Sequence, residues 1–336
     1  MSTIEKLTPQ MKAYSSHFAD SGIINWLPYT MYFHPFSYTS PTVNTDSMGF
    51  RYSDARGCRY SFANLEGISG VRLLAGSSTV FGIGASADRH TLASRLTEND
   101  TRPEFWINFG GRSFNSTQEL ILYVLHRQML PRVAEIVLFS GFNDLGLAHL
   151  PARYRRAHGA FFNCGDFYDA LTKPRSTGLG SWFGRTPEED TEDDVPGIDQ
   201  QIGYAVDQTL RHLDTWRIMA RETGARLTFV LQPLANWVRQ KGCAEEEELF
   251  AELEQRGGFT ATYGAILQPE NFLAYAEQLK AGVLAMGLGF VNMAPLMASA
   301  IQDDQWVFVD RIHFTDAGHD FVAKLLLGGI DAGGTP

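Results

Sequence analysis

The chain has 336 residues, 44% of them hydrophobic and 20% charged, which is typical of a globular protein with one large core or two smaller domains. Its formal net charge of -10 argues against a nucleic-acid-binding face and against attachment to an anionic membrane, since both need basic residues. The cysteines Cys58, Cys164 and Cys243 are widely spaced without a CxxC pair, so we expect free thiols and neither a disulfide framework nor a zinc site.

The amino terminus, MSTIEKLTPQMKAYSSHFAD, lacks the pattern of a secretion signal, because no charged region is followed by an apolar one. No stretch of about 18 apolar residues, the length that spans a bilayer, occurs in the sequence. We therefore expect a cytoplasmic protein with no membrane insertion. Small molecules or other proteins are the partners that its acidic character favours.

Residues 1–70 are rich in aromatic residues, Pro, Ser and Thr, as in WLPYTMYFHPFSYTSPTVN. This composition predicts irregular or short β structure. No linker separates the segment from the rest of the chain, so we expect an N-terminal extension over 1–70 that packs on a main domain over 71–336.

Five short apolar runs predict strands at 71–75, 105–109, 135–140, 226–232 and 289–293. Most are apolar at consecutive rather than alternate positions, which is typical of strands covered on both faces. Helical patterns lie between them, at 91–99, 116–129, 198–224 and 269–287. Strands that alternate with helices predict a parallel, doubly wound α/β sheet.

Residues suited to helix ends accompany these patterns. Ser116 or Thr117 is placed to cap the helix over 116–129. Gly224 and Gly287 are placed to end the two later helices.

Two insertions interrupt the alternation. The first, about 146–197, contains the basic cluster RYRR, an acidic run and several aromatic residues: Phe161, Phe162, Phe167, Tyr168, Trp182 and Phe183. Long loops are often functional, so a lid or substrate wall and a solvated excursion are both open. The second, about 237–266, contains the helix-like AEEEELFAELEQRG, whose glutamates we expect on a solvated face.

Polar residues lie at the points where the predicted strands end. The first three strands are followed by the segments Gly76-Ser77-Ser78-Thr79, Asn108-Phe109-Gly110-Gly111 and Gly141-Phe142-Asn143-Asp144. Near the carboxyl terminus, Asp310 stands three residues before His313. Because open parallel sheets bind ligands at the carboxyl ends of their strands, we expect these four segments to meet.

These residue types suit nucleophilic catalysis. A serine hydroxyl needs a base to take its proton, and the base works best when a third group fixes its tautomer. Asp310 and His313 can supply both groups from one loop. The backbone N–H groups of Ser78 and Gly110 and the side-chain amide of Asn143 can hold the oxyanion of a tetrahedral intermediate.

Together the four segments resemble the SGNH hydrolase superfamily, also called GDSL-type esterases and lipases, from about Val71 to the carboxyl terminus. The resemblance is strongest in SGFND and DRIHFTDAGH. It implies a three-layer α/β/α domain with a flavodoxin-like, five-stranded parallel sheet. It also assigns roles by position: Ser78 is the nucleophile, Gly110 and Asn143 are oxyanion donors, His313 is the base and Asp310 orients it.

The chain departs from the family pattern at one position, reading Gly76-Ser77-Ser78 where the family name specifies Gly-Asp-Ser. Ser78 still aligns as the nucleophile in preference to Ser77. Taken singly, Ser78 also fits a helix cap, and His313 a structural histidine. Gly110 fits a tight turn and Asn143 an Asx turn. The occurrence of all four segments in order favours catalysis.

A metal site is the alternative use of the last segment. Asp310, His313, Asp316 and His319 follow one another at spacings of three. We expect Thr315 or Asp316 to cap the following helix and to turn His319 to its outer face, which disfavours a metal. The sequence contains no motif for a nucleotide, flavin or metal, so no cofactor is expected.

The expected activity is hydrolysis of a short-chain acyl ester, such as an acetyl group on a sugar or small metabolite, through an acyl-enzyme on Ser78. Transfer of the acyl group to an alcohol or amine acceptor is the first alternative, because the same intermediate serves both reactions. A catalytically inactive binding protein of the same fold is the second.

Overall fold

The structure is a computed structural model that describes residues 2–18, 27, 29–30, 32–150, 155 and 195–332. Most of the first insertion lies outside these residues, including its six aromatic side chains, its acidic run and Cys164. Of the RYRR cluster, only Arg155 is described. Cys58 and Cys243 are free thiols, as predicted.

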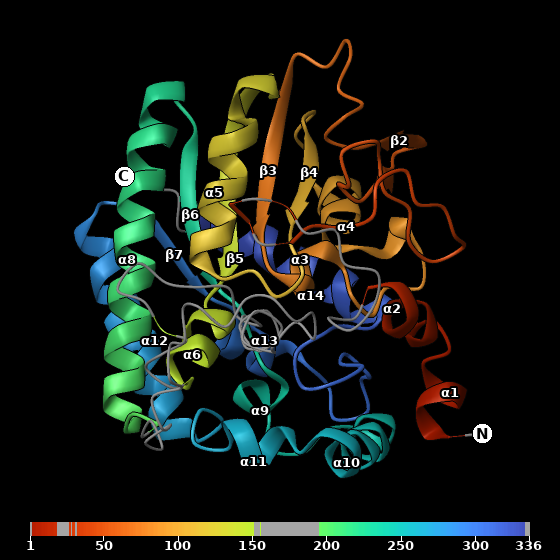
Figure 1. Ribbon diagram of the computed structural model, residues 1–336, viewed down its shortest axis with the longest axis vertical. Coiled ribbons are helices and arrows are strands. Elements are labelled where there is room, and N and C mark those ends of the chain that lie inside the picture. The colour runs from red at the N-terminus through yellow and green to blue at the C-terminus, as the bar shows by residue number, and fades with distance from the viewer. Residues whose placement is uncertain are drawn as a thin grey trace, which may run out of the picture.

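A five-stranded parallel sheet forms the centre of the molecule (Figure 1). Its strands are β3 (Gly70–Gly76), β4 (Phe105–Gly110), β5 (Arg132–Ser140), β6 (Arg226–Leu231) and β7 (Gly289–Asn292). They lie in the order β4-β3-β5-β6-β7, and every neighbouring pair is parallel. All five predicted strands are confirmed, and counted along the chain this is the 2-1-3-4-5 order of flavodoxin-like sheets.

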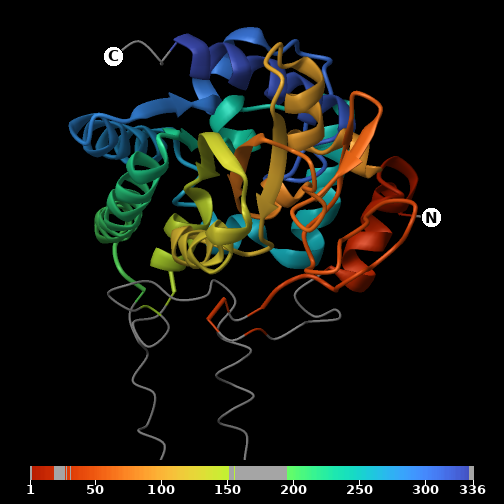
Figure 2. The same cartoon turned by 90° about the horizontal axis from the view of Figure 1, so that it is seen from above.

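Helices cover both faces of the sheet, as Figures 1 and 2 show. One face carries α4 (Leu92–Asn99), α13 (Met293–Ala300) and α14 (Asp316–Ala332). The other carries α5 (Ser116–His126), α8 (Ile198–Thr223) and α12 (Pro269–Ala285). The predicted three-layer α/β/α architecture is confirmed.

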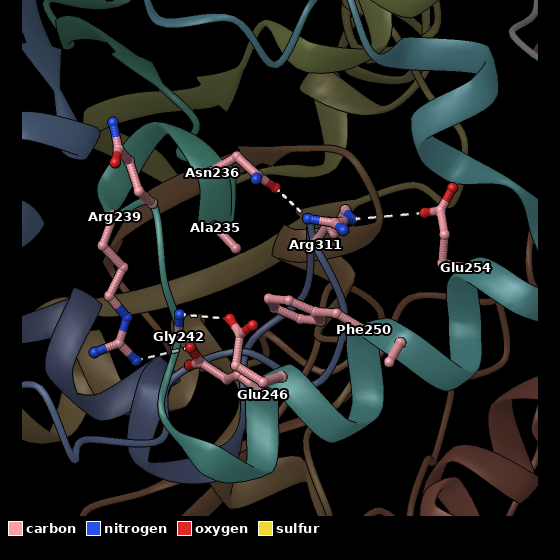
Figure 3. Close-up of a pocket in the computed structure, with 11 residues that line it drawn as sticks. Ala235, Asn236, Arg239, Gly242, Glu246, Phe250, Glu254 and Arg311 are labelled. Atoms are coloured by element: carbon pink, nitrogen blue, oxygen red, sulfur yellow. Dashed lines mark hydrogen bonds and ion pairs between the residues drawn. The ribbon is translucent and has the colours of Figure 1, made fainter.

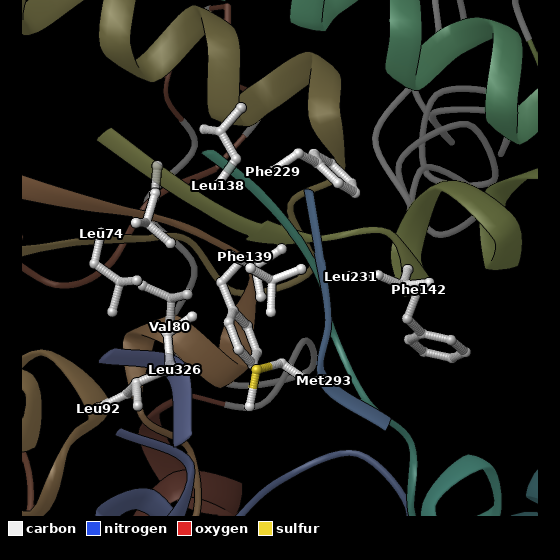
Figure 4. Packing of buried hydrophobic residues seen from close by; sticks show 14 of the residues in the cluster. Leu74, Val80, Leu92, Leu138, Phe139, Phe142, Phe229, Leu231, Met293 and Leu326 are labelled. Carbon is white, nitrogen blue, oxygen red and sulfur yellow. The ribbon is translucent and has the colours of Figure 1, made fainter. Parts of the chain in front are cut away.

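The core explains why the strands read as continuous apolar runs. Leu138 and Phe139 are neighbours along β5, and Figure 4 shows their side chains on opposite faces of the sheet. Phe139 points toward Met293 and Leu326, in the layer of α13 and α14. Both faces of the strand are buried, so both must be apolar.

Most helix ends agree with the expected signals. Gly224, in the left-handed conformation, ends α8, and Gly287, also at positive φ, lies just beyond the end of α12, as predicted. The prediction for α5 was wrong by one residue. Asn115 caps this helix, because its side chain accepts a hydrogen bond from the N–H of Thr117 at 2.9 Å.

The N-terminal extension contains more helix than predicted. Two short helices, α1 (Thr3–Leu7) and α2 (Met11–His17), precede a hairpin of β1 (Ser53–Ala55) and β2 (Cys58–Tyr60). Ser2 and Glu5 form a capping box at the start of α1. The Ser-x-x-Glu spacing of that box was a readable signal for this helix.

Five further helices lie at the carboxyl ends of the strands, in the lower half of Figure 1. They are α3 (Ser78–Phe81), α6 (Phe142–Ala148), α9 (Ala235–Val238), α10 (Ala244–Gly257) and α11 (Phe259–Tyr263). Two 3₁₀ turns, Asp88–His90 and Arg127–Met129, complete the described elements. Within these parts of the chain, no helix combines the length and apolar character required to cross a bilayer.

Candidate active site

Ser78, His313 and Asp310 form a continuous chain of hydrogen bonds. Ser78 is the first residue of α3, directly after β3, and its Oγ lies 2.8 Å from Nε2 of His313. Nδ1 of His313 lies 2.7 Å from Oδ2 of Asp310. A base therefore lies against a hydroxyl, and a carboxylate holds the other ring nitrogen, which is the arrangement that activates a serine nucleophile.

The loop itself fixes Asp310. Oδ1 of Asp310 accepts hydrogen bonds from the backbone N–H groups of Ile312 and His313, both at 2.7 Å. Burial alone would raise the pKa of Asp310, but the charge of His313 and these hydrogen bonds outweigh it and hold the pKa below its ordinary value. Asp310 is therefore ionised at neutral pH and can stabilise a protonated His313.

Ser77 and Ser78 have different surroundings. The Ser77 hydroxyl is buried and donates to Oε1 of Gln232 at 3.2 Å, whereas Ser78 contacts His313. Nε2 of Gln232 in turn donates to Oγ1 of Thr79 at 2.9 Å. Gln232 thus holds the turn on both sides of Ser78. The sequence gives only a weak indication of this role, since Gln232 is simply a polar residue at the end of the predicted strand over 226–232.

Asn143 lies at the start of α6, after a turn that only glycine fits. Gly141 has φ of 120°, and a Cβ there would lie 2.7 Å from the side chain of Leu231. Nδ2 of Asn143 donates to the carbonyl oxygen of Phe114 at 2.6 Å. The predicted amide donor is therefore anchored beside the loop that follows β4.

Gly110 has a hydrogen-bond partner within β4. Its N–H donates to Oδ1 of Asn108 at 3.1 Å, a bond that it would have to give up to bind an oxyanion, so its role as a donor stays a prediction. A Cβ at Gly110 would lie 2.2 Å from the backbone nitrogen of Phe81. Close packing of β4 against α3 is thus what this glycine permits.

Ser113 is a second candidate for a backbone donor, in the loop that follows β4. It has φ of 57°, a strained conformation for a serine, and such residues concentrate at functional sites. It directly precedes Phe114, the residue that anchors Asn143. Sequence reasoning missed Ser113, because a serine gives no signal for a positive φ.

Buried carboxylates lie behind Asn143. Asp144 accepts hydrogen bonds from Oγ of Ser116 at 2.5 Å and from Nε2 of Gln208 at 2.8 Å, which ties α6 to α5 and α8. Burial raises the pKa of Asp144 to about 6, although these hydrogen bonds oppose the rise. Burial and the charge of Asp144 raise the pKa of Glu119 well above its ordinary value. This network fixes the position of Asn143.

His319 is buried, which corrects the expectation that it lies on the outer face of α14. Thr315 does cap the helix, since its Oγ1 accepts from the N–H of Gly318 at 2.9 Å. His319 nevertheless lies on the inner face, where its ring packs edge-on against Phe314 with centroids 5.4 Å apart. Burial, followed by the charge of Arg51, lowers the pKa of His319 to about 3, so the ring is neutral.

Of the four residues of the alternative metal site, Asp310 and His313 bond to each other, whereas Asp316 and His319 contact other residues. Both carboxylate oxygens of Asp316 accept hydrogen bonds from Ser86, at 2.7 and 2.5 Å. Across the described parts of the chain, no three histidine, cysteine or acidic side chains are grouped so that they could hold a metal ion.

The second insertion holds the loop that carries Asp310. Glu246 of α10 is only 1% exposed, which corrects its expected place on a solvated face. Its Oε1 accepts from the N–H groups of Val307 and Phe308, both at 2.9 Å, and its Oε2 from Nη2 of Arg239 at 2.7 Å (Figure 3). Arg239 also donates to the carbonyl of Gln305 at 2.7 Å.

A cavity of about 320 Å³ lies beside this network. Figure 3 shows Arg311 in it, between Asn236 and Glu254. Nη1 of Arg311 donates to Oδ1 of Asn236 at 2.6 Å, and Nε lies 4.0 Å from Oε2 of Glu254. The two arginines of this cavity are therefore each paired with a glutamate of α10, and the carboxylate of Glu247 accepts a hydrogen bond from the N–H of Gly242.

The strand order is the one that the sequence resemblance implies, and Ser78 and Asn143 lie just after the ends of β3 and β5. The chain therefore has a three-layer α/β/α fold around a parallel sheet of flavodoxin-like order.

Comparison with known proteins gives no match to a family model and none to a curated protein. Among solved structures, a lipase/acylhydrolase from Enterococcus faecalis is 14% identical, with 79% of this chain and 96% of that chain covered at a TM-score of 0.43. A member of the lipolytic G-D-S-L family from Veillonella parvula is 11% identical, with 77% and 97% covered at a TM-score of 0.44. Support for a function must therefore come from the geometry of the site.

Proposed function

We propose that this protein is a serine-dependent carboxylic ester hydrolase. The observation that carries the proposal is the hydrogen-bonded chain from Ser78 through His313 to Asp310, with distances of 2.8 and 2.7 Å. An inactive binding protein has no need of this chain, so the geometry favours catalysis over that alternative.

The first half of the reaction forms an acyl-enzyme. Oγ of Ser78 attacks the ester carbonyl carbon while Nε2 of His313 takes the hydroxyl proton, and the negative charge of Asp310 stabilises the resulting imidazolium. The carbon–oxygen bond to the alcohol then breaks, and His313 gives its proton to the departing oxygen. The acyl group remains on Ser78.

The second half releases the acid. A water molecule gives a proton to His313 and attacks the acyl carbon, and the proton then returns to Ser78 as its bond to the acyl group breaks. The amide of Asn143 and the backbone N–H groups of Ser78 and Ser113 are the proposed donors to the oxyanion in both halves. Removing one such donor typically lowers kcat by about 10²–10³-fold.

A short-chain acyl ester is the proposed substrate, such as an acetyl group on a sugar or small metabolite. The Gly-Ser-Ser sequence at Ser78, in place of Gly-Asp-Ser, gives no support to a lipase-like preference. Transfer to an alcohol or amine acceptor would use the same acyl-enzyme, so the products decide between the two reactions.

Mass spectrometry of the intact protein after treatment with a fluorophosphonate tests the proposal. We expect a single stable adduct on Ser78, present in Ser77→Ala and absent from Ser78→Ala. A folded protein that takes no adduct on Ser78 would instead support the binding-protein alternative. Hydrolysis of an acetyl ester with and without added alcohols then distinguishes release of acetate from transfer of the acetyl group.

A further inference from the structure

A groove of about 700 Å³ lies beside the proposed catalytic triad of Ser78, His313 and Asp310, with Asp310 and His313 on its wall. Its other walls come from separate parts of the chain: α1 and α2 of the N-terminal extension, Ile83 after α3, and Leu253 and Arg256 of α10. A volume of this size suits a small organic molecule. Nothing in the sequence pattern indicates that residues 2–18 reach the catalytic residues.

The N-terminal wall is attached to both of its neighbours. The Tyr14 hydroxyl lies 2.8 and 2.6 Å from the carbonyl oxygens of Gly82 and Ala85, in the loop that follows the Ser78 helix. The backbone N–H of Ile4 donates to Oε2 of Glu252 in α10 at 3.2 Å. The groove is therefore a built feature, with its shape fixed at both ends.

The lining of the groove is mainly apolar. Tyr14 and Phe18 are buried in its wall, and Ile4, Met11, Ile83 and Leu253 also line it. Outside the triad, the charged residues that line the groove are Glu5, Lys12 and Arg256. They are exposed and carry both signs of charge, so the lining favours neither anions nor cations. The wall suits a neutral, apolar group.

The position of His313 decides which part of an ester can enter. Nε2 of His313 gives its proton to the alcohol oxygen that leaves, so the alcohol must lie on the His313 side of the scissile bond. The carbonyl oxygen must face Asn143. His313 and Asp310 line the groove, whereas Ser78, Phe114 and Asn143 are not among the described residues that line it.

We propose that this groove binds the alcohol part of the ester, and that this part is apolar, which among the substrates proposed above favours an apolar small metabolite over a sugar. The assignment rests on the proposed esterase function and adds the leaving-group side of its substrate. The acyl group then lies outside the groove, and the N-terminal helices determine specificity without contacting it.

Two series of esters separate the sides of the site. Ethyl and hexyl acetate share the acyl group and have similar intrinsic reactivity, and ethyl acetate and ethyl hexanoate share the alcohol. We expect kcat/KM for hexyl acetate to exceed that for ethyl acetate by about tenfold or more, as buried methylene groups do in apolar pockets. Leu253→Ala should reduce this ratio several-fold and leave the ratio for the two acyl groups unchanged.

Leu273→Ala is the matched control, because Leu273 is 58% exposed on α12 and does not line the groove. It should leave both ratios unchanged. If Leu253→Ala fails to fold, Met11→Ala on the surface of α2 tests the same wall.

Equal rates with ethyl and hexyl acetate, or equal effects of Leu253→Ala and Leu273→Ala, would overturn the assignment. A change in the acyl ratio instead would place the acyl group in the groove and overturn it equally. In each case the adduct on Ser78 and Ser78-dependent hydrolysis of ethyl acetate would persist, so the proposed function would stand. Loss of both the adduct and all hydrolysis would remove the proposed function, and this assignment with it.

Discussion

At the scale of single residues, the two adjacent serines at the end of β3 have opposite roles. Ser78 lies 2.8 Å from the base, whereas Ser77 donates into a buried network with Gln232 and Thr79. We expect Ser78→Ala to lower kcat by about 10⁵-fold or more. Ser77→Ala removes one buried hydrogen bond, so it should cost about 1 kcal/mol of stability and less than tenfold in activity. Steady-state kinetics and urea unfolding measure both.

The comparison of the two serine variants requires that both are folded. Both variants should show the far-UV circular dichroism of the parent chain. Equal loss of activity in the two folded variants would leave Ser78 without its assigned role.

His319 gives the protein a pH-dependent stability. Its pKa is lowered by burial and by the charge of Arg51 to about 3, while a histidine in the unfolded chain titrates near 6.5. Between these values the unfolded chain binds a proton that the folded protein does not, so the free energy of unfolding falls as pH falls through this window. We expect His319→Phe, which does not titrate, to remove about 2 kcal/mol of the stability lost between pH 7 and pH 5.

Urea unfolding of both proteins at the two pH values measures this difference. The substitution places an apolar ring beside Phe314, where the imidazole packs now. If the parent and His319→Phe lost the same stability between pH 7 and pH 5, His319 would not be the buried neutral group described.

Chelators should leave ester hydrolysis unchanged. Asp316 is bonded to Ser86, His319 is buried, and Asp310 is bonded to His313, so the acidic and histidine side chains of this segment do not converge. Activity before and after dialysis against EDTA is the measurement. Activity lost on dialysis and restored by zinc would reassign the segment as a metal site.

Element by element, the catalytic loop depends on a helix that lies outside the α/β alternation. Glu246 of α10 accepts hydrogen bonds from Val307 and Phe308, and Arg239 binds the carbonyl of Gln305. The last of these contacts is at Phe308, two residues before Asp310. The second insertion is thus a support for the triad, although it supplies none of its members.

We expect Glu246→Gln to lower kcat with little change in KM, because it disturbs the loop that positions Asp310 and leaves the groove in place. Breaking a buried pair with Arg239 should also cost about 3–5 kcal/mol of stability. Glu248→Gln, on the exposed side of the same helix, is the matched control and should change neither quantity. Steady-state kinetics over a range of substrate concentrations, together with urea unfolding, compare the two variants. A rise in KM at constant kcat would show that Glu246 acts on binding and not on Asp310.

At the scale of helices and strands, the sequence predicts those features that local residue patterns determine. The strands of the sheet were predicted because burial on both faces requires unbroken apolar runs, such as 135–140. The pairing of Asp310 with His313 follows from residue type and spacing, and the choice of Ser78 from the family resemblance. Ser113 and Glu246 were not predicted, because a positive φ at a serine and the burial of one glutamate among several are properties of the folded chain.

For the whole molecule, one buried arginine ties the N-terminal extension to the α/β domain. Arg51 is 0% exposed and donates from Nε to Asp88 at 3.0 Å. Its Nη1 donates to the Tyr14 hydroxyl at 2.9 Å and to the carbonyl of Gly82 at 2.8 Å, and its Nη2 to the carbonyl of Thr42 at 2.8 Å. The extension, the loop after α3 and the segment of Asp88 therefore meet at one guanidinium group.

This arrangement predicts that residues 2–18 and the α/β domain unfold together. Arg51→Leu leaves the Asp88 carboxylate without its buried partner, so we expect a loss of about 3–5 kcal/mol, with the groove beside His313 opened because Tyr14 and Gly82 lose their common donor. Arg59→Leu is the matched control: Arg59 faces the same carboxylate at 3.8 Å but is 50% exposed, so its removal should cost less than about 1 kcal/mol.

Urea unfolding followed by tryptophan fluorescence, together with hydrogen exchange of the α2 amides, measures whether residues 2–18 and the α/β domain unfold together. The parent chain should show one transition, with α2 amides exchanging only as the core opens. Exchange of α2 at low urea, well before the fluorescence transition, would mean that the extension is a separately unfolding unit and that Arg51 stabilises only its own segment.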